Sequence, residues 1–289
     1  MKASKIILGT VQFGLDYGIN NSSGKPTEER AHAILKEAFD RGIKTLDTAA
    51  AYGNSEELIG NYHRKSTEKY SVITKFHIHK GVEVSEIIDV ALEKLGVNSI
   101  DTLFFHSFQD YLSNPEIIQE LIKEVDKERI HRLGVSVYTN NEIRSLLSVP
   151  EIDVIQAPFN LLDNHSKRAE VFQNAKSKGK KILTRSVFLQ GLFFKPLDSL
   201  PKKLRPLKSA LEHIHQTAQK TGISMATLAM NYALSKEYID GVLVGVDSVG
   251  QLKENVKTIE EVIPDQIFQQ IDTITVENPY LLNPVNWNS

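Results

Sequence analysis

Residues 45–53, TLDTAAAYG, place Asp47 at the end of a short apolar run and Tyr52 shortly after it. Two further runs of the same kind follow, since SVITK ends on Lys75 and DTLFFH ends on His106. In a parallel α/β barrel, the carboxyl ends of all strands meet at one face, and that face carries the active site. We therefore expect these four residues to converge at the mouth of such a barrel.

Short β-branched or aliphatic runs alternate with amphipathic segments along the whole chain. The predicted strands are residues 5–9, 43–47, 71–75, 101–105, 132–136, 153–156, 181–185 and 241–244. The predicted helices are residues 27–41, 55–63, 85–95, 115–127, 140–147, 166–178, 206–221, 224–236 and 251–261. This alternation favours a single (β/α)8 TIM barrel domain over residues 1–289, although a doubly wound open sheet would show the same pattern.

Composition excludes several classes of function. The chain has 289 residues, a net charge of −2 at pH 7 and no cysteine. The near-neutral charge predicts no affinity for nucleic acid or an anionic membrane, and the lack of cysteine removes disulfides and thiolate metal sites. No apolar run approaches the ~20 residues that span a bilayer, and no secretion signal is visible. We expect a cytoplasmic protein without a metal that acts on a small molecule as a monomer or small homo-oligomer.

The four converging residues suit the chemistry of carbonyl compounds. Reduction of an aldehyde or ketone takes a hydride from a cofactor and a proton from an acid, because a free alkoxide is too basic to form near neutral pH. A phenol is a weak acid in water, and a neighbouring cation makes it a better proton donor. Lys75 can supply that cation beside Tyr52 while Asp47 holds the ammonium. His106 can donate a hydrogen bond to the carbonyl oxygen.

Other interpretations of these residues stay open. Each one alone also has an ordinary structural explanation, such as a helix cap for Asp47 or a buried core position for His106. A Schiff-base aldolase or lyase would use Lys75 as a nucleophile, and a regulatory subunit would bind a nicotinamide cofactor with little turnover. An ion pair with Asp47 would keep Lys75 protonated and argue against the aldolase. Tyr52 and His106 together argue against the regulatory subunit.

The chain resembles the aldo-keto reductase family from end to end. LGTVQFG at residues 8–14 is similar to the family's first strand and loop, and TLDTAAAYGNSEELIG at residues 45–60 is similar to its best-known signature. ITK, DTLFFH, LGVSVY, VIQAPFNLL, TRSVFLQGLF and VGVDSVGQLKEN follow in the family's order. The resemblance implies an NAD(P)-dependent oxidoreductase that acts on an aldehyde or ketone, or in reverse on an alcohol. It also implies a catalytic tetrad of Asp47, Tyr52, Lys75 and His106, with Tyr52 as general acid or base.

The resemblance further implies a nicotinamide cofactor across the barrel mouth without a Rossmann fold, and no GxGxxG motif follows a strand in this sequence. Ser136 and Gln156 match the side chains that bind the carboxamide. The loop after the seventh strand approaches the pyrophosphate, and the segment after the eighth reaches the adenosine. The implied cofactor positions, besides Ser136 and Gln156, are Gly9, Thr10, Asp47, Arg185, Ser186, Leu189, Gln190, Gly245, Ser248, Gln251, Glu254 and Asn255.

Three departures from the family pattern concern the cofactor. Val137 stands where many relatives have asparagine, so one carboxamide bond is expected to be missing or to come from Asn160. Arg185 stands where an aromatic ring often stacks on the nicotinamide, and its planar guanidinium can stack or pair with an anion. The adenosine segment lacks the cations typical of relatives that require NADP(H), although Lys253 and Lys257 could substitute. Family precedent leads us to expect NADP(H), with NAD(H) as the alternative.

The expected substrate contacts are Tyr52, His106 and two aromatic residues near the first strand, Phe13 and Tyr17. The C-terminal tail, NPYLLNPVNWNS, is short, which predicts an open mouth suited to a polar substrate. A sugar-like carbonyl compound is therefore the predicted substrate. Further aromatic residues expected around the same mouth are Phe108, Tyr111 and Phe159.

Overall fold

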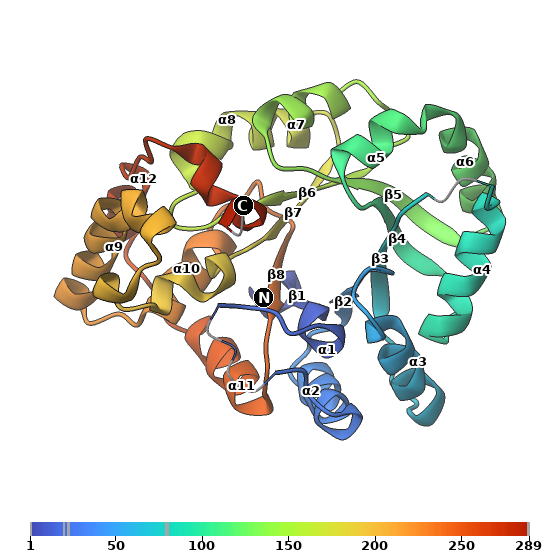
Figure 1. Ribbon diagram of the computed structural model, residues 1–289, viewed down its shortest axis with the longest axis horizontal. Helices are drawn as coiled ribbons and strands as arrows, with labels where there is room; N and C mark the ends of the chain where they lie inside the picture. Colours follow the sequence, from blue (N-terminus) through green and yellow to red (C-terminus); the bar gives the residue numbers. More distant parts are fainter. Residues whose placement is uncertain (1, 20, 22–23, 79–80, 288–289) are drawn as a thin grey trace.

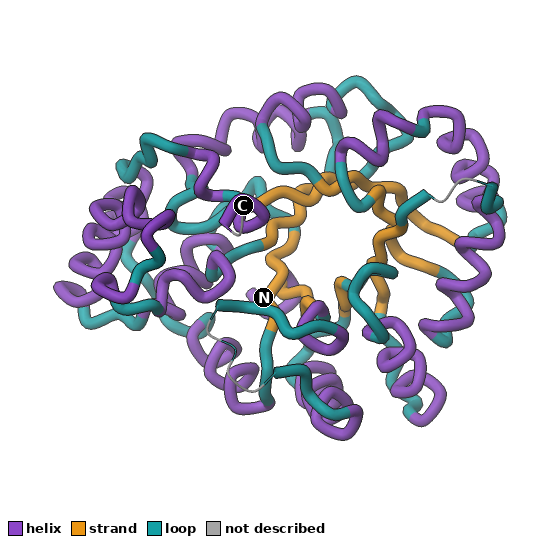
Figure 2. Tube along the Cα trace, in the orientation of Figure 1, coloured by secondary structure: helices purple, strands orange, loops and turns teal. Residues whose placement is uncertain are grey.

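Eight parallel strands close into a barrel in which each strand pairs with the next along the chain and β8 returns to β1. The computed structural model describes residues 2–19, 21, 24–78 and 81–287. Figure 2 shows the strands as a central ring with helices outside it. The closed barrel confirms the predicted fold and rules out the open sheet. The strands are β1 Ile6–Gly9, β2 Thr45–Asp47, β3 Ser71–Phe76, β4 Ile100–Phe105, β5 Ile130–Ser136, β6 Val154–Pro158, β7 Lys181–Arg185 and β8 Gly241–Gly245.

The helices surround the barrel in chain order (Figure 1). Local sequence signals set several of their starts. The Thr27 side chain accepts a hydrogen bond from the Arg30 backbone at the start of α2, and Thr139 and Glu142 form a reciprocal capping box at the start of α7. The helices are α1 Val11–Gly14, α2 Glu28–Asp40, α3 Ser55–Lys65, α4 Val84–Leu95, α5 Phe108–Ser113, α6 Ile118–Asp126, α7 Asn140–Leu146, α8 His165–Ser177, α9 Lys208–Thr221, α10 Met225–Leu234, α11 Val249–Thr258 and α12 Asp265–Asp272.

The main differences from the predicted elements lie in short helical segments. Helices α1, α5 and α12 were not predicted, and the predicted helix 115–127 begins with a 3-10 turn, Pro115–Ile117, before α6. Proline at the first position suits such a turn because it has no amide hydrogen to leave unpaired. The predicted strand 43–47 shortens to β2. Its carboxyl end stays at Asp47, whereas β3, β6 and β8 end one or two residues later than predicted, at Phe76, Pro158 and Gly245.

A small apolar cluster fills the barrel interior below its mouth. It consists of Ile7, Ile73, Phe104, Val154, Leu183 and Leu243, which come from different strands. The Phe104 ring lies against Gly134, where an added Cβ would come within 2.6 Å of its Cε1 atom. A much larger apolar cluster lies between the strands and the helices. The barrel is thus a packed core with a closed floor, and only its mouth is open to carry polar groups.

Candidate active site

The floor of the barrel explains which side chains reach its mouth. Alternate residues of a strand point to the same side, so the residue two positions beyond each floor residue also points into the barrel. Ile73 is followed in this way by Lys75, and Phe104 by His106. The same step leads from the other floor residues to Gly9, Gln156, Arg185 and Gly245, all of which line one pocket. Strand periodicity therefore builds this site.

Lys75 and Asp47 form a buried ion pair at the base of the pocket. Lys75 Nζ lies 2.5 Å from Asp47 Oδ1 and donates a second hydrogen bond, at 2.9 Å, to the Thr48 carbonyl. The two side chains are only 2% and 4% exposed. Burial alone would lower the pKa of Lys75, but the Asp47 charge and Tyr52 outweigh it and raise that pKa above its ordinary value. The lysine is therefore a fixed cation at neutral pH.

Tyr52 lies beside this cation in the loop that follows β2. Lys75 Nζ is 5.1 Å from the centre of the Tyr52 ring. Two glycines allow the loop to press against α1: a Cβ on Gly14 would lie 1.7 Å from the Tyr52 carbonyl oxygen, and one on Gly53, whose φ is +55°, would lie 2.5 Å from the Gly14 carbonyl oxygen. This backbone contact fixes the position of Tyr52 over the pocket.

His106 faces Tyr52 across the pocket, with its ring edge-on to the Tyr52 ring at 5.9 Å between centres. His77 stacks on its other side at 4.5 Å and pairs with Asp110 at 3.2 Å. Burial, with smaller effects of Lys75 and His77, lowers the pKa of His106 to about 4. The imidazole is thus neutral near pH 7 and can donate one hydrogen bond. Its Nδ1 is buried and has no partner among the described residues.

The pocket has a volume of about 490 Å³, a size typical of sites for cofactors and small molecules. Gln156 is fully buried and donates from Nε2 to Asp47 Oδ2 at 2.8 Å. Its Oε1 is buried without a partner among the described residues. That unpaired acceptor, next to the Ser136 wall, fits the NH₂ group of a nicotinamide carboxamide.

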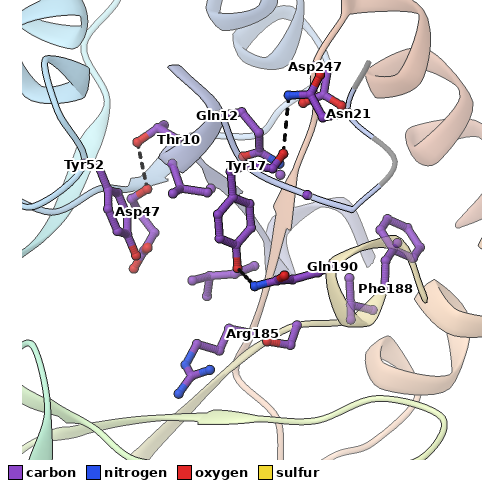
Figure 3. A pocket seen from close by; sticks show the side chains of 18 of the residues that line it. Thr10, Gln12, Tyr17, Asn21, Asp47, Tyr52, Arg185, Phe188, Gln190 and Asp247 are labelled. Atoms are coloured by element: carbon purple, nitrogen blue, oxygen red, sulfur yellow. Dashed lines mark hydrogen bonds between the residues drawn. The ribbon is translucent and has the colours of Figure 1, made fainter. Parts of the chain in front are cut away.

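The loop after β7 crosses the pocket and contacts the loop after α1. Gln190 Nε2 donates to Tyr17 Oη at 2.9 Å, and the Ile19 amide donates to the Gln190 carbonyl at 3.1 Å. Figure 3 shows this side-chain contact at the centre of the pocket. Ser186, Leu189 and Gln190 have positive φ values of 64°, 47° and 54°. Strained backbone of this kind is common at ligand sites.

Arg185 occupies the tetrad side of the pocket. Its guanidinium lies 4.1 Å from the centre of the Tyr138 ring and donates to the Val137 carbonyl at 3.1 Å. In this structure Arg185 therefore stacks on the Tyr138 side chain of the protein itself. Val137 is fully buried.

Most of the predicted site residues line the pocket together. They are Gly9, Thr10, Tyr17, Asp47, Tyr52, Lys75, His106, Ser136, Gln156, Arg185, Ser186, Gln190, Gly245, Gln251, Glu254 and Asn255. The last three come from α11, so the pocket extends from the tetrad to that helix.

Three of the predicted site residues lie outside the pocket wall. Phe13 is fully buried in the apolar layer between strands and helices, because α1 turns its ring inward. Leu189 is also fully buried, since its apolar side chain packs into the core below the loop. Ser248 accepts a hydrogen bond from the Gln251 amide as the cap of α11. These three side chains do not line the pocket in this structure, and their expected roles stay predictions.

The further aromatic residues and Asn160 also belong to the protein's packing. Phe159 is fully buried and stacks on Tyr232, while Phe108 and Tyr111 pack against the core at the barrel edge. The Asn160 side chain accepts from the Leu162 and Asp163 amides and donates to the Ser186 carbonyl. It is buried and supports the β7 loop from below, so it is not available to a carboxamide.

Sequence reasoning missed most wall residues that come from loops. Leu243 and Tyr138 could have been found by stepping along β8 and just past β5, but the others depend on how loops fold back or on how α1 and α10 pack against the mouth. The missed residues are Val11, Gln12, Gly18, Asn21, Tyr138, Val187, Phe188, Gly191, Phe194, Ala226, Leu243 and Asp247.

Two features of the described residues bear on other classes of function. No cluster of three or more histidine, aspartate or glutamate side chains in that part of the chain could hold a metal ion. None of the helices described is both long and apolar enough to cross a membrane.

Comparisons with known proteins agree with this geometry. The pattern of the Aldo/keto reductase family matches residues 5–276. L-galactose dehydrogenase from Arabidopsis thaliana is 28% identical over 285 residues, which cover 90% of this chain and 86% of that protein. L-glyceraldehyde 3-phosphate reductase from Escherichia coli (strain K12) is 24% identical over 274 residues, 80% of this chain and 79% of that protein.

Among solved structures, aldo-keto reductase AKR11C1 from Bacillus halodurans in its holo form superposes with a TM-score of 0.76 at 21% identity. The match covers 94% of this chain and 92% of that one, and it supports the fold. The family match spans nearly the whole chain and takes in all eight strands of the barrel. The chain accordingly belongs to the Aldo/keto reductase family and is an oxidoreductase of the kind that uses a nicotinamide cofactor.

Proposed function

We propose that this enzyme reduces the carbonyl group of a sugar-like aldehyde or ketone, or oxidises the corresponding alcohol, with NAD(P)(H) as its cofactor. Tyr52 acts as the general acid in reduction and as the general base in oxidation. The names of the relatives support a sugar-like substrate, because one names L-galactose, a sugar, and the other names L-glyceraldehyde 3-phosphate, a triose phosphate. A small molecule is thus the proposed partner, and the cytoplasmic location stays a prediction from the sequence.

One observation carries the proposal, which is the Lys75 cation held by Asp47 beneath the Tyr52 ring. A bound nicotinamide cofactor supplies or accepts the hydride. Tyr52 donates its phenolic proton to the substrate oxygen, and the nearby ammonium stabilises the phenolate that remains. His106 is neutral near pH 7 because burial lowers its pKa, so it donates a hydrogen bond that orients the substrate oxygen.

The geometry of the site argues against both alternative functions. A Schiff base forms from a neutral amine, whereas Asp47 keeps Lys75 charged and engages it at 2.5 Å. Borohydride trapping with a carbonyl substrate should therefore leave Lys75 unmodified. A regulatory subunit with little turnover would not need the tyrosine, lysine and histidine arranged in this way, and a turnover assay separates it from an enzyme.

The experiment that tests the proposal is Tyr52→Phe. We expect the rate of carbonyl reduction to fall by about 10²–10⁴-fold, the usual contribution of a positioned general acid. Cofactor affinity, measured by fluorescence titration, should change by no more than a few-fold because the ring remains. Tyr280→Phe is the matched control, since Tyr280 is 58% exposed and lies outside the pocket wall. Unchanged turnover in Tyr52→Phe would rule out the acid role.

A further inference from the structure

The end of the pocket formed by α11 differs in charge from the tetrad end. Its wall includes Asp247 and Glu254, together with Gln12 from α1. The cations among the described residues of the wall are Lys75 and Arg185, and both belong to the tetrad end. Figure 3 shows Arg185 and Asp247 on opposite sides of the pocket. A ligand that extends from the tetrad to α11 therefore meets carboxylates there.

Two hydrogen-bond acceptors at this end lack donors. Gln12 Oε1 and Asp247 Oδ1 are buried and have no partner among the described residues. The Gln12 amide lies directly against Gly245, where an added Cβ would come within 2.3 Å of its Nε2, so its position is restricted. A buried acceptor without a donor is costly. Ligand groups that donate hydrogen bonds, such as hydroxyls, would satisfy these atoms.

A carboxylate residue lies next to the amino end of α11. A helix N-terminus carries a partial positive charge that would attract a phosphate. Here Ser248 caps the helix, and Asp247 immediately precedes it, with the Asp247 amide donating to Gln251 Oε1 at 2.8 Å. An incoming phosphate would meet the Asp247 carboxylate at this position. A phosphate at this end of the helix would therefore lie near a carboxylate of the same charge.

The lysines that could have replaced a missing cation point elsewhere. Lys253 pairs with Glu37 of α2 at 3.6 Å and is 52% exposed, and Lys257 is also exposed. Neither lines the pocket. Lys25 donates to the Asn54 side chain. Among the described residues, the pocket wall beside α11 therefore contains no lysine or arginine.

We propose that the α11 end of the pocket selects NAD(H) over NADP(H), with Asp247 and Gln12 accepting hydrogen bonds from the adenosine ribose and with Asp247 and Glu254 repelling a 2′-phosphate. The inference rests on the proposed use of a nicotinamide cofactor. It reverses the expectation from family precedent, which placed NADP(H) ahead of NAD(H). The reason is physical, because a 2′-phosphate would lie beside the half-buried Asp247 and the exposed Glu254, and the described residues of that part of the wall include no cation.

The test is direct binding of NADH and NADPH, measured by fluorescence titration and calorimetry at about pH 8, where carboxylates are ionised. NADH should bind more tightly by about tenfold or more, because one like-charge pair in a partly buried site is worth at least that factor. Asp247→Asn and Glu254→Gln should each lower the ratio of the NADPH dissociation constant to the NADH dissociation constant by about threefold or more, mainly because NADPH binds more tightly. Glu260→Gln is the control, because Glu260 is exposed beyond α11 and outside the wall.

Adenosine diphosphoribose and its 2′-phosphorylated form give a second readout that needs no nicotinamide and no turnover. The unphosphorylated form should bind more tightly to the wild-type protein, and Asp247→Asn should narrow the difference. Tighter or equal binding of NADPH by the wild-type protein would overturn the inference while leaving the proposed function standing. Failure of both dinucleotides to bind would instead reject the proposed function. If Glu260→Gln changes the NADPH-to-NADH ratio of dissociation constants as much as Asp247→Asn does, the assignment of the preference to Asp247 and Glu254 would be rejected.

Discussion

Replacing Asp47 with asparagine tests the ion pair on which the site depends. The change removes a buried charge and leaves the Lys75 ammonium 2% exposed without its carboxylate partner. Burial then favours the neutral amine. Keeping a lysine neutral at pH 7 costs about 4.6 kcal/mol, because its ordinary pKa of ~10.4 lies ~3.4 above pH 7 and each pH unit is worth ~1.36 kcal/mol. We expect the free energy of unfolding to fall by about 3–5 kcal/mol, the usual loss when one partner of a buried pair is removed.

The pH dependence of this loss has a definite sign. In the wild-type protein burial lowers the pKa of Lys75, but the Asp47 charge and Tyr52 raise it more, so the pair stabilises the fold fully below pH ~10.4 and is lost above it. In Asp47→Asn the folded-state pKa of Lys75 lies below the unfolded value, so the unfolded chain binds the extra proton. The stability of the variant therefore rises with pH, and the gap to wild type narrows by up to ~1.4 kcal/mol per pH unit.

Urea unfolding at about pH 7 and about pH 9 measures both effects. Asp40→Asn is the matched control, because Asp40 pairs with Lys36 at 3.2 Å with both side chains more than half exposed. That surface pair should cost about 1 kcal/mol or less, with little change between the two pH values. Equal losses in the two variants, or a gap for Asp47→Asn that does not narrow as pH rises, would refute the reasoning.

Two further predictions concern His106 and the loop after β7. Burial, with Lys75 and His77, lowers the pKa of His106 to about 4, so wild-type stability should fall as pH drops from ~6.5 toward 4. Over that pH range, the free energy of unfolding of His106→Asn, measured with urea, should fall by up to about 3 kcal/mol less than that of the wild-type protein. Parallel plots of unfolding free energy against pH for the two proteins would contradict this. Gln190→Ala removes the bond to Tyr17 Oη and should speed cofactor release about two- to tenfold in stopped-flow measurements. Tyr17→Phe breaks the same hydrogen bond and should speed cofactor release by the same factor. Unequal release rates in the two variants would assign the effect to another contact.

The barrel could be predicted from sequence because its signals are local and repeated. Each strand is a short apolar run, and the polar residue at its end marks where the barrel interior changes from packed floor to open mouth. Lys75 and His106 are found in this way because they sit two residues beyond Ile73 and Phe104. The short helices α5 and α12 carry weaker patterns, since six or eight residues give less than three turns of periodicity.

Aromatic residues near the mouth could not be assigned from sequence in the same way. Phe13 and Tyr17 lie four residues apart in one segment, yet Phe13 is fully buried and Tyr17 bonds to Gln190 across the pocket. Hydrophobic type alone predicts packing for both, and only the path of the loop decides which ring faces the ligand. The same holds for Leu189, whose neighbour Gln190 lines the pocket although both have positive φ.

The residues that set cofactor preference show the limit most clearly. The sequence shows that the cations typical of NADP(H)-dependent relatives are missing after β8. That absence alone would weaken binding of the 2′-phosphate without repelling it. The fold adds two facts that depend on distant segments: Gln12 is pressed against Gly245, and Lys253 is drawn to Glu37 on α2. Together they leave the acceptor atoms Gln12 Oε1 and Asp247 Oδ1 unpaired at the place where a 2′-phosphate would need cationic side chains. The two carboxylates of the proposed selectivity, Asp247 and Glu254, are visible in VGVDSVGQLKEN itself. The positions of Gln12 and of the Lys253 side chain depend instead on contacts between the first and last elements of the barrel, which that local pattern does not encode.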